Sequence, residues 1–265
     1  MKKIFLTLLV IFLMTGCGGE KESENVNSMK YSRQIIIGMD EFAPFGYTDE
    51  SGNIVGFDVD MAKEAAKRMG VEPEFKIIDW NEKESEFNSG RVDMIWNGLN
   101  ITGNRDQYML FSRPYMDNRQ ILMVKHGNPK GIHALGDLAG KIVAVQVDST
   151  ARINLNDDKY LRDSFAELKT CQTVEDGFEA LKNGELDALI IDEIAARYEI
   201  NRHPGELETV EAMVGPPTHF AIGFKKGNTA LRDKVQKVLD EMIKDGTAKK
   251  FSLEWFGADL IKSSR

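Results

Sequence analysis

The chain has 265 residues, 42% of them hydrophobic, which is enough for a large core in one big domain or in two lobes. Its formal charge is −8, and removal of a leader that carries two lysines takes it to −10, which argues against nucleic acid or an acidic lipid surface as a partner. The four histidines are scattered without a metal-ligand spacing, so we expect neither a metal site nor a cofactor.

The N-terminus has the pattern of an export signal. Two lysines precede the short apolar run Ile4–Met14, and two further residues separate that run from Cys17. We therefore expect a secretory signal over residues 1–16. The segment resembles a bacterial lipobox, which predicts lipid attachment at Cys17 rather than plain secretion. Residues 17–32 are polar and aperiodic, as expected of a flexible tether.

Strand-like and helix-like patterns then alternate along the chain. In chain order we expect a strand over Gln34–Met39, a helix over Asp58–Met69, a strand over Glu74–Ile78, a helix over Asn81–Ser89, a strand over Met94–Trp96, a strand over Ile142–Gln146, a helix over Val174–Asn183, a strand over Ala188–Ile191, a helix over Glu193–Ile200 and a helix on the apolar stripe of residues 231–242. This order predicts an α/β fold with largely parallel sheets covered by helices.

One local pattern occurs twice. Gly90 and Gly184 each end a predicted helix, and the chain turns through an Asp three residues later into a strand. Both strands run directly into polar residues, Asn97 to Arg105 in the first case and Asp192 in the second. Because ligands of open α/β sheets lie beyond the carboxyl ends of the strands, the repeat predicts two lobes that face a cleft.

The turn after the strand Met94–Trp96 has the composition of an anion site. Backbone N–H groups near Gly98 and Asn100, together with the guanidinium of Arg105, are able to hold a carboxylate. No nucleophile accompanies them. An ordinary Asn-Gly turn beside a solvated arginine is the alternative.

Several motifs together resemble the family 3 solute-binding proteins of polar amino-acid ABC importers. They are Gly56-Phe57-Asp58-Val59-Asp60-Met61, Asp79-Trp80, Asn97-Gly98-Leu99-Asn100-Ile101-Thr102 with Arg105, Phe111-Ser112 with Pro114-Tyr115, Gly140-Lys141 with Val143, Val145 and Gln146, Ser149-Thr150, and Asp187-Ala188 with Asp192. The resemblance implies the two-lobed periplasmic-binding-protein (type II) fold, in which each lobe is a sheet flanked by helices and two strands form the hinge. It places lobe 1 at residues 33–117 plus 220–265 and lobe 2 at residues 118–219.

The resemblance also implies a role for each site residue. Arg105 would bind the ligand α-carboxylate with backbone N–H groups of Asn100 and Thr150. Asp192 would accept from the α-ammonium, beside the Gly98 carbonyl and the Asn100 side chain. The alternative for Asp192 is a helix N-cap. The remaining lining residues would be Phe42 and Trp80 at the ligand side chain, with Asn97, Ser149, Gln146 and Asp40.

Some of these positions keep a second interpretation. Core packing is the alternative for Phe42 and Trp80, and a solvated turn is the alternative to a cation contact for Asp40 and Glu41. Helix initiation accounts for Asp58 at the start of the first long helix. Two positions depart from the family pattern. Asn100 stands where Ser or Thr is common, and Asp148 replaces a common Gly and adds a negative charge near the mouth of the site.

We therefore expect an exported, lipid-anchored, monomeric receptor that binds a polar L-amino acid and delivers it to ABC permease subunits. Glutamine, arginine, lysine, histidine and cystine are all compatible with the sequence, and the acidic charge leans toward a cation. An enzyme resembling cyclohexadienyl dehydratase is the alternative, with Glu193 or His219 as acid or base. We do not expect a sensor input domain, which would precede a membrane helix and a signalling module.

Overall fold

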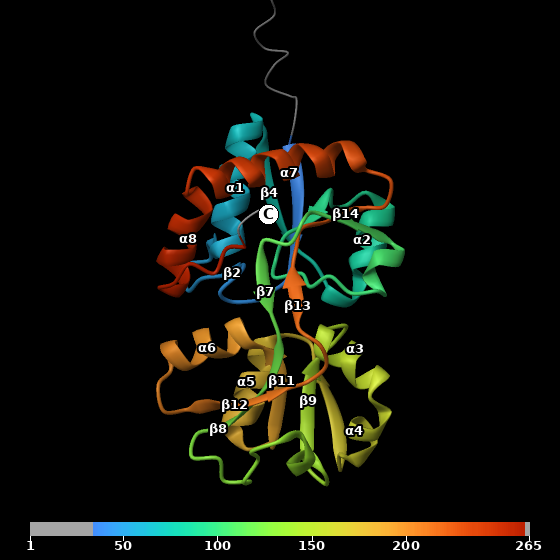
Figure 1. Cartoon of the computed structure of the whole chain (residues 1–265), viewed down its shortest axis with the longest axis vertical. Helices are drawn as coiled ribbons and strands as arrows, with labels where there is room; N and C mark the ends of the chain where they lie inside the picture. The colour runs from blue at the N-terminus through green and yellow to red at the C-terminus, as the bar shows by residue number, and fades with distance from the viewer. Residues whose placement is uncertain (1–33, 263–265) are drawn as a thin grey trace, which may run out of the picture. The chain divides into compact units, whose positions relative to one another are not determined.

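The computed structural model describes residues 34–262, which form two lobes, each built on a five-stranded sheet (Figure 1). The first lobe has strand order β4-β1-β5-β14-β6, with bounds Glu72–Ile77, Gln34–Met39, Met94–Ile95, Gly223–Lys225 and Met109–Phe111. The second lobe has strand order β10-β9-β11-β8-β12, with bounds Glu167–Cys171, Ile142–Gln146, Ala188–Asp192, Gln120–Lys125 and Leu207–Met213.

Helices cover both sheets. The first lobe carries α1 (Phe57–Met69), α2 (Lys83–Ser89), α7 (Thr229–Lys244) and α8 (Thr247–Phe256), and the second carries α3 (Thr150–Asp157), α4 (Lys159–Ser164), α5 (Val174–Asn183) and α6 (Glu193–Arg202). The short hairpin β2 (Tyr47–Thr48) and β3 (Ile54–Val55) and the 3₁₀ turns η2 (Trp80–Glu82), η3 (Arg105–Gln107) and η4 (Leu135–Leu138) complete the described elements. None of the helices in this part of the chain combines the length and hydropathy needed to span a bilayer.

Two paired strands join the lobes. β7 (Met116–Asn118) and β13 (Thr218–Phe220) run antiparallel, with Asp117 opposite His219 (Figure 1). Each crossing leads into a strand that runs against its neighbours: β8 is antiparallel to β11 and β12, and β14 is antiparallel to β5 and β6. The expectation of largely parallel sheets is confirmed, since the other four strands of each sheet share one direction. Only the strand that the chain enters after a crossing is reversed.

Most predicted elements are present, several with the expected ends. The strands Gln34–Met39 and Ile142–Gln146 and the helix Val174–Asn183 have the predicted bounds. The predicted helix over Asn81–Ser89 is divided into η2 and α2. Helices α3, α4 and α8 were not predicted, because α3 and α4 are short and polar and α8 follows α7 almost without a break.

The repeated Gly-x-x-Asp pattern has the same local structure in both lobes. Gly90 and Gly184 end α2 and α5 in the left-handed conformation, with φ of 71° and 79°. The following carboxylates then bond to a neighbouring strand: Asp93 accepts from Ile36 N at 2.8 Å, and Asp187 accepts from Ile142 N at 2.9 Å. The repeat therefore aligns β5 with β1 and β11 with β9, which brings the polar ends of β5 and β11 toward the cleft.

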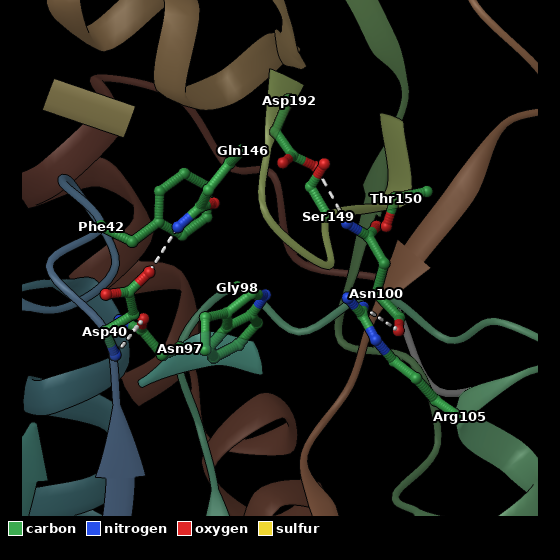
Figure 2. A pocket seen from close by; sticks show the side chains of 11 residues that line it. Asp40, Phe42, Asn97, Gly98, Asn100, Arg105, Gln146, Ser149, Thr150 and Asp192 are labelled. Carbon is green, nitrogen blue, oxygen red and sulfur yellow. Dashed lines mark hydrogen bonds between the residues drawn. The ribbon is translucent and has the colours of Figure 1, made fainter. Parts of the chain in front are cut away.

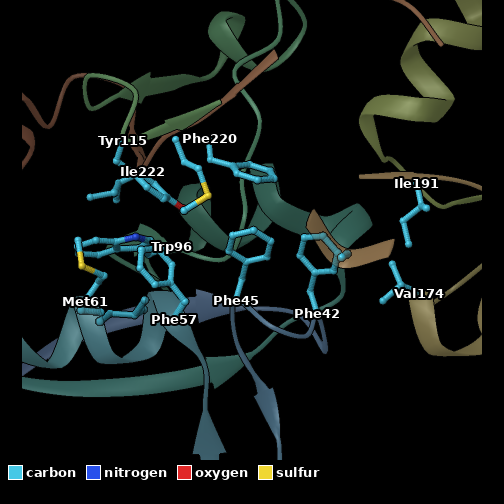
Figure 3. Packing of buried hydrophobic residues seen from close by; sticks show 14 of the residues in the cluster. Phe42, Phe45, Phe57, Met61, Trp96, Tyr115, Val174, Ile191, Phe220 and Ile222 are labelled. Atoms are coloured by element: carbon cyan, nitrogen blue, oxygen red, sulfur yellow. The ribbon is translucent and has the colours of Figure 1, made fainter. Parts of the chain in front are cut away.

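Aromatic packing lies directly under the cleft. Phe45 is fully buried, and its ring packs on Phe42 at 5.3 Å and on Phe220 at 4.7 Å between ring centres. Figure 3 shows Phe42 between this cluster and the apolar side chains of Val174 and Ile191 in the second lobe. The predicted signal over residues 1–16, the tether over 17–32 and Cys17 lie outside the described residues.

Candidate functional site

One pocket between the lobes gathers the residues selected from the sequence (Figure 2). It encloses about 290 Å³ of empty space, including space open to solvent. Its lining is Asp40, Phe42, Trp80, Asn97, Gly98, Asn100, Arg105, Gln146, Ser149, Thr150 and Asp192. These residues come from the carboxyl ends of strands β1, β4, β5, β9 and β11 and from the segments that follow them. The strand-end argument predicts this location for Asn97 to Arg105 and for Asp192.

Arg105 presents an unpaired donor at the pocket. It begins η3 and is 2% exposed. One terminal nitrogen donates to Asn100 O at 3.0 Å, and the other donates to Asp148 O at 2.7 Å. Its Nε is buried and has no partner among the described residues. A guanidinium that meets carbonyls but no carboxylate retains its full positive charge for an anion.

The start of α3 adds further donors to this side of the pocket. The Ser149 hydroxyl caps the helix by accepting from Arg152 N at 3.2 Å. The Thr150 hydroxyl is buried without a partner in the described part of the chain. Neither the Thr150 N–H nor the Asn100 N–H is hydrogen-bonded to a described residue. The N-terminal end of a helix also carries partial positive charge, so this side of the pocket favours an anion.

Asp192 lines the pocket, and three neutral side-chain amides surround its carboxylate. Its Oδ1 accepts from Asn100 Nδ2 at 2.9 Å, from Gln120 Nε2 at 2.7 Å and from the Asn118 amide. No described residue donates to its Oδ2. Asp192 occupies the N-cap position of α6, but its side chain makes no capping hydrogen bond. Burial raises the pKa of Asp192, and the three amide bonds oppose that rise.

Asn118, Gln120 and Thr218 belong to this network and were missed in the sequence. The Asn100 Oδ1 atom accepts from Thr218 Oγ1 at 2.7 Å and from Asn118 Nδ2 at 3.1 Å, so the network joins both hinge strands. A signal was available, because Asn118 and Gln120 are polar, two positions apart and followed by the apolar run of β8. Side chains two apart share one face of a strand.

Asp58 supports the ligand loop, and its assignment as a helix start needs correction. The N-cap of α1 is Gly56, while Asp58 is completely buried within the first turn. Its Oδ2 accepts from Gly98 N at 2.7 Å and from Tyr115 Oη at 2.8 Å. Burial raises the pKa of Asp58 to about 7. The Gly98 N–H, which we expected to be available for a carboxylate, is therefore already hydrogen-bonded. The Gly98 carbonyl has no partner among the described residues.

The remaining polar lining residues differ in what they leave free. The Asn97 side-chain amide is already hydrogen-bonded to the backbone, since it accepts from Asp40 N at 3.0 Å and donates to Gly46 O at 3.1 Å. Asp40 accepts from Glu41 N at 2.8 Å and from the Gln146 amide across the cleft. Burial raises the pKa of Asp40 to about 6, and no described cation forms an ion pair with it. Asp40 is thus an acidic group that has only neutral donors.

The two aromatic residues Phe42 and Trp80 are buried and also line the pocket. Phe42 is 6% exposed and stacks on the core, and it also lines the pocket (Figures 2 and 3). Trp80 is 7% exposed, lines the pocket, and has its ring 5.8 Å from Arg105 Cζ. Both rings therefore contribute to the core and to a flat apolar wall of the pocket.

The acid and base residues of the enzyme alternative lie elsewhere. Glu193 is paired with Arg119 and with Arg197, the latter at 2.6 Å. His219 bonds to Asp117 at 2.6 Å on the hinge strands. Neither Glu193 nor His219 lines the pocket.

A group of potential metal ligands was not expected from the sequence. Glu199, His203 and Glu206 bring ligand atoms within 4.8 Å of one another on the second lobe. Lys182 Nζ lies 2.9 Å from Glu199 and 3.2 Å from Glu206, so a protein cation already bridges these carboxylates. The arrangement is accounted for as a salt-bridge cluster.

The pocket therefore offers both unpaired donors and unpaired acceptors. The donors come from Arg105, Thr150 and the Asn100 backbone, and the acceptors are Asp192 and the Gly98 carbonyl. Buried unpaired polar groups are costly, and a small molecule with an anionic and a cationic end satisfies both kinds of group at once.

Several known proteins are similar to this chain in sequence or in fold. The arginine-binding extracellular protein ArtP of Bacillus subtilis is 31% identical, covering 97% of this chain and 98% of its own length. The L-cystine-binding protein TcyJ of Escherichia coli is 26% identical, covering 98% and 97%. An ABC uptake transporter substrate-binding protein from Streptococcus pneumoniae, crystallised with bound histidine, has a TM-score of 0.83 at 31% identity and covers 89% of this chain and 98% of its own.

The relatives share the two-lobed type II architecture that the strand order shows. The sequence profile of the bacterial extracellular solute-binding proteins, family 3, matches residues 35–258. The chain therefore belongs to family 3 of the bacterial extracellular solute-binding proteins.

Proposed function

We propose that this protein binds one L-amino acid in the pocket between its lobes and delivers it to the permease of an ABC importer. The observation that carries the proposal is that unpaired donors and unpaired acceptors meet at one small pocket. An amino-acid zwitterion has charges that match both kinds of group. The solute-binding family and the named ligands of the relatives support this assignment.

The backbone of the ligand would be held by groups that have no other partner. Arg105, with the N–H groups of Asn100 and Thr150, would bind the α-carboxylate. The free oxygen of Asp192 and the Gly98 carbonyl would accept from the α-ammonium. A cation beside Asp192 favours its ionised form, which counteracts the effect of burial on the pKa.

The ligand side chain would lie between the rings of Phe42 and Trp80 and reach Asp40. Asp40 is the lining carboxylate that the zwitterion leaves unmatched, so the pocket favours a side chain with a positive charge. Arginine, lysine and histidine supply one, and cystine supplies a second ammonium. Relatives described as binding arginine, histidine and cystine support this class.

Ligand exchange would require the lobes to separate at the hinge. We propose that lobe 1 comprises residues 33–117 and 220–265, lobe 2 comprises residues 118–219, and β7 and β13 bend between them. Because the ligand would contact both lobes, it stabilises the closed arrangement through contacts that the open one lacks.

Binding without chemistry fits the site better than catalysis. Glu193 and His219 are each engaged outside the pocket. The relatives named above are binding proteins. We propose in addition that the protein is an exported monomer tethered to the membrane through lipid on Cys17, as the sequence pattern of residues 1–17 indicates.

The test is a thermal melting screen of the ligand-free protein against the common amino acids, cystine and prephenate. Ligand at 100 times its Kd stabilises the fold by about 2.7 kcal/mol. For a fold of this size, that corresponds to a rise in Tm of roughly 5–10 °C. We expect the largest rise with a basic L-amino acid and a smaller one with L-glutamine. A rise with prephenate alone would contradict the proposal and favour the enzyme.

A further inference from the structure

A buried lysine lies immediately behind the pocket wall. Lys83 begins α2 in the first lobe, and its side chain is 0% exposed. Its ammonium donates to the Trp80 carbonyl and lies 4.3 Å from the centre of the Trp80 ring. A buried ammonium needs a counter-charge, because the loss of hydration costs several kcal/mol.

The counter-charge comes from the other lobe. Asp148 lies in the turn between β9 and α3, and its carboxylate is 2.6 Å from Lys83 Nζ. The carbonyl of the same residue accepts from Arg105 at 2.7 Å. Asp148 of the second lobe thus contacts two cationic side chains of the first lobe, Lys83 and Arg105, and Arg105 lines the pocket.

The backbone of Asp148 is in an unfavourable conformation for its side chain. Its φ is +46°, in the left-handed region where glycine is preferred. Glycine would relieve the strain but would remove the carboxylate. A strained non-glycine residue beside a functional pocket suggests that its side chain has a use there.

We propose that Lys83 and Asp148 form an inter-lobe ion pair that positions the pocket wall and makes tight ligand binding depend on Asp148. The proposal rests on the proposed function, since binding is taken to close the lobes. When the lobes are closed, Lys83 is cut off from water and Asp148 replaces its hydration. When they separate, Asp148 withdraws and water reaches the ammonium. Removal of Asp148 alone therefore penalises the closed form, because that form still buries the lysine charge.

The charges around Lys83 agree with this account. Burial and, to a smaller extent, the neighbouring Arg105 lower the pKa of Lys83 to about 7, against the opposing effects of Asp148 and Asp40. Asp148 is thus the hydrogen-bonded carboxylate that favours the protonated form of Lys83 in the closed arrangement.

The test is a double-mutant cycle with L-arginine as the probe in titration calorimetry. We expect Asp148→Gly, which suits the positive φ, to weaken binding at least about tenfold. The double variant Asp148→Gly with Lys83→Met also removes the lysine charge, which has lost its carboxylate partner. Its affinity should return to within about threefold of wild type. Rescue by a second substitution is a result that a purely local effect on the turn would not produce.

A matched control removes an ion pair within one lobe. Asp245→Asn breaks the pair with Arg68, 2.7 Å long, without touching the cleft, and should leave the affinity unchanged. The inference is wrong if Asp148→Gly binds as tightly as wild type. It is also wrong if the double variant is no better than Asp148→Gly alone.

Small-angle X-ray scattering of the ligand-free proteins separates this inference from the proposed function. If wild type binds no amino acid, the proposed function fails, but the pair still predicts a larger radius of gyration for Asp148→Gly than for wild type and the double variant. Equal radii for all three proteins would overturn the pair as well.

Discussion

Asp192 divides its two carboxylate oxygens between the protein and the pocket. Three amides donate to Oδ1, and no donor in the described part of the chain reaches Oδ2. Neutral amides orient a carboxylate without cancelling its charge. A buried acid held in this way gains most from a cation that arrives with a ligand, which is the role we propose for it.

Arg105 should be indispensable for every amino acid, because its contact is to the carboxylate that all of them share. We expect Arg105→Ala to weaken binding at least about 100-fold, since the ligand carboxylate would be buried without its cation. Titration calorimetry with L-arginine and L-glutamine measures the loss. Arg91→Ala, which breaks the pair of the exposed Arg91 with Glu86 in the same lobe, is the control and should bind normally. Near-native affinity in Arg105→Ala would refute the assignment.

Asp40 should make the affinity for a basic amino acid depend on pH. Burial raises its pKa to about 6 in the free protein, and a bound cation would keep it ionised. Binding is then at full strength above pH 6 and weakens as pH falls, by up to about tenfold per pH unit. Calorimetry with L-arginine between pH 5 and 8 measures this slope.

Asp40→Asn provides the comparison for that slope, because an amide does not titrate in this range. We expect this variant to bind L-arginine more weakly at pH 7.5 and to lose the dependence between pH 5 and 6. An unchanged slope in Asp40→Asn would assign the titration to another group, such as Asp58, whose pKa is raised to about 7.

At the level of elements, a hydrogen bond to α1 fixes the loop that follows β5. The Asp58 carboxylate reaches across from the first turn of α1 to the Gly98 N–H and the Tyr115 hydroxyl. The loop therefore presents the Gly98 carbonyl and the Asn100 side chain from a rigid support. A site carried by a braced loop keeps its geometry better than one on a free loop.

Gly98 cannot be replaced without displacing the pocket wall. Its φ is +55°, and an added Cβ would lie 2.6 Å from Phe42 Cε1 and 3.0 Å from Phe45 Cδ2. We expect Gly98→Ala to lower the free energy of unfolding by about 1–3 kcal/mol and to weaken ligand binding strongly. Urea unfolding and calorimetry measure the two effects separately.

Gly90→Ala is the matched control for Gly98→Ala. Gly90 also has a left-handed φ, of 71°, but an added Cβ there meets nothing within 4 Å. We expect it to lower stability through backbone strain alone and to leave binding intact. Equal loss of binding in both variants would show that steric contact with Phe42 is not the cause.

At the level of the whole molecule, the lobes contact each other on both sides of the pocket. Tyr47 and Tyr198 meet through their hydroxyls at 3.1 Å, and Asn100 bonds to Asp192 at 2.9 Å. The Asp40–Gln146 and Arg105–Asp148 hydrogen bonds and the Lys83–Asp148 pair add further contacts. The structure is therefore a closed arrangement, with the pocket held between residues of both lobes.

The sequence by itself determined the positions of several central strands and helices and, with the family resemblance, the residues that line the pocket. Apolar periodicity and glycine stops are local signals, so α1, α5, β1 and β9 were recognisable without tertiary information. The repeated Gly-x-x-Asp turn located the two strand ends where polar residues gather. Because parallel strands direct those ends to one edge, Asn97 to Arg105 and Asp192 followed from the chain order, and the other lining residues came from the resemblance to the family.

Only the tertiary structure decided what each polar group is paired with. Asp58 meets Gly98 across 40 positions, Lys83 meets Asp148 across 65, and Asn118 meets Asp192 across 74. No local pattern encodes such contacts, since they depend on how the crossings between lobes bring distant strands together. For the same reason, only the tertiary structure shows which donors and acceptors have no partner in the protein. Those groups indicate the charges that the ligand carries.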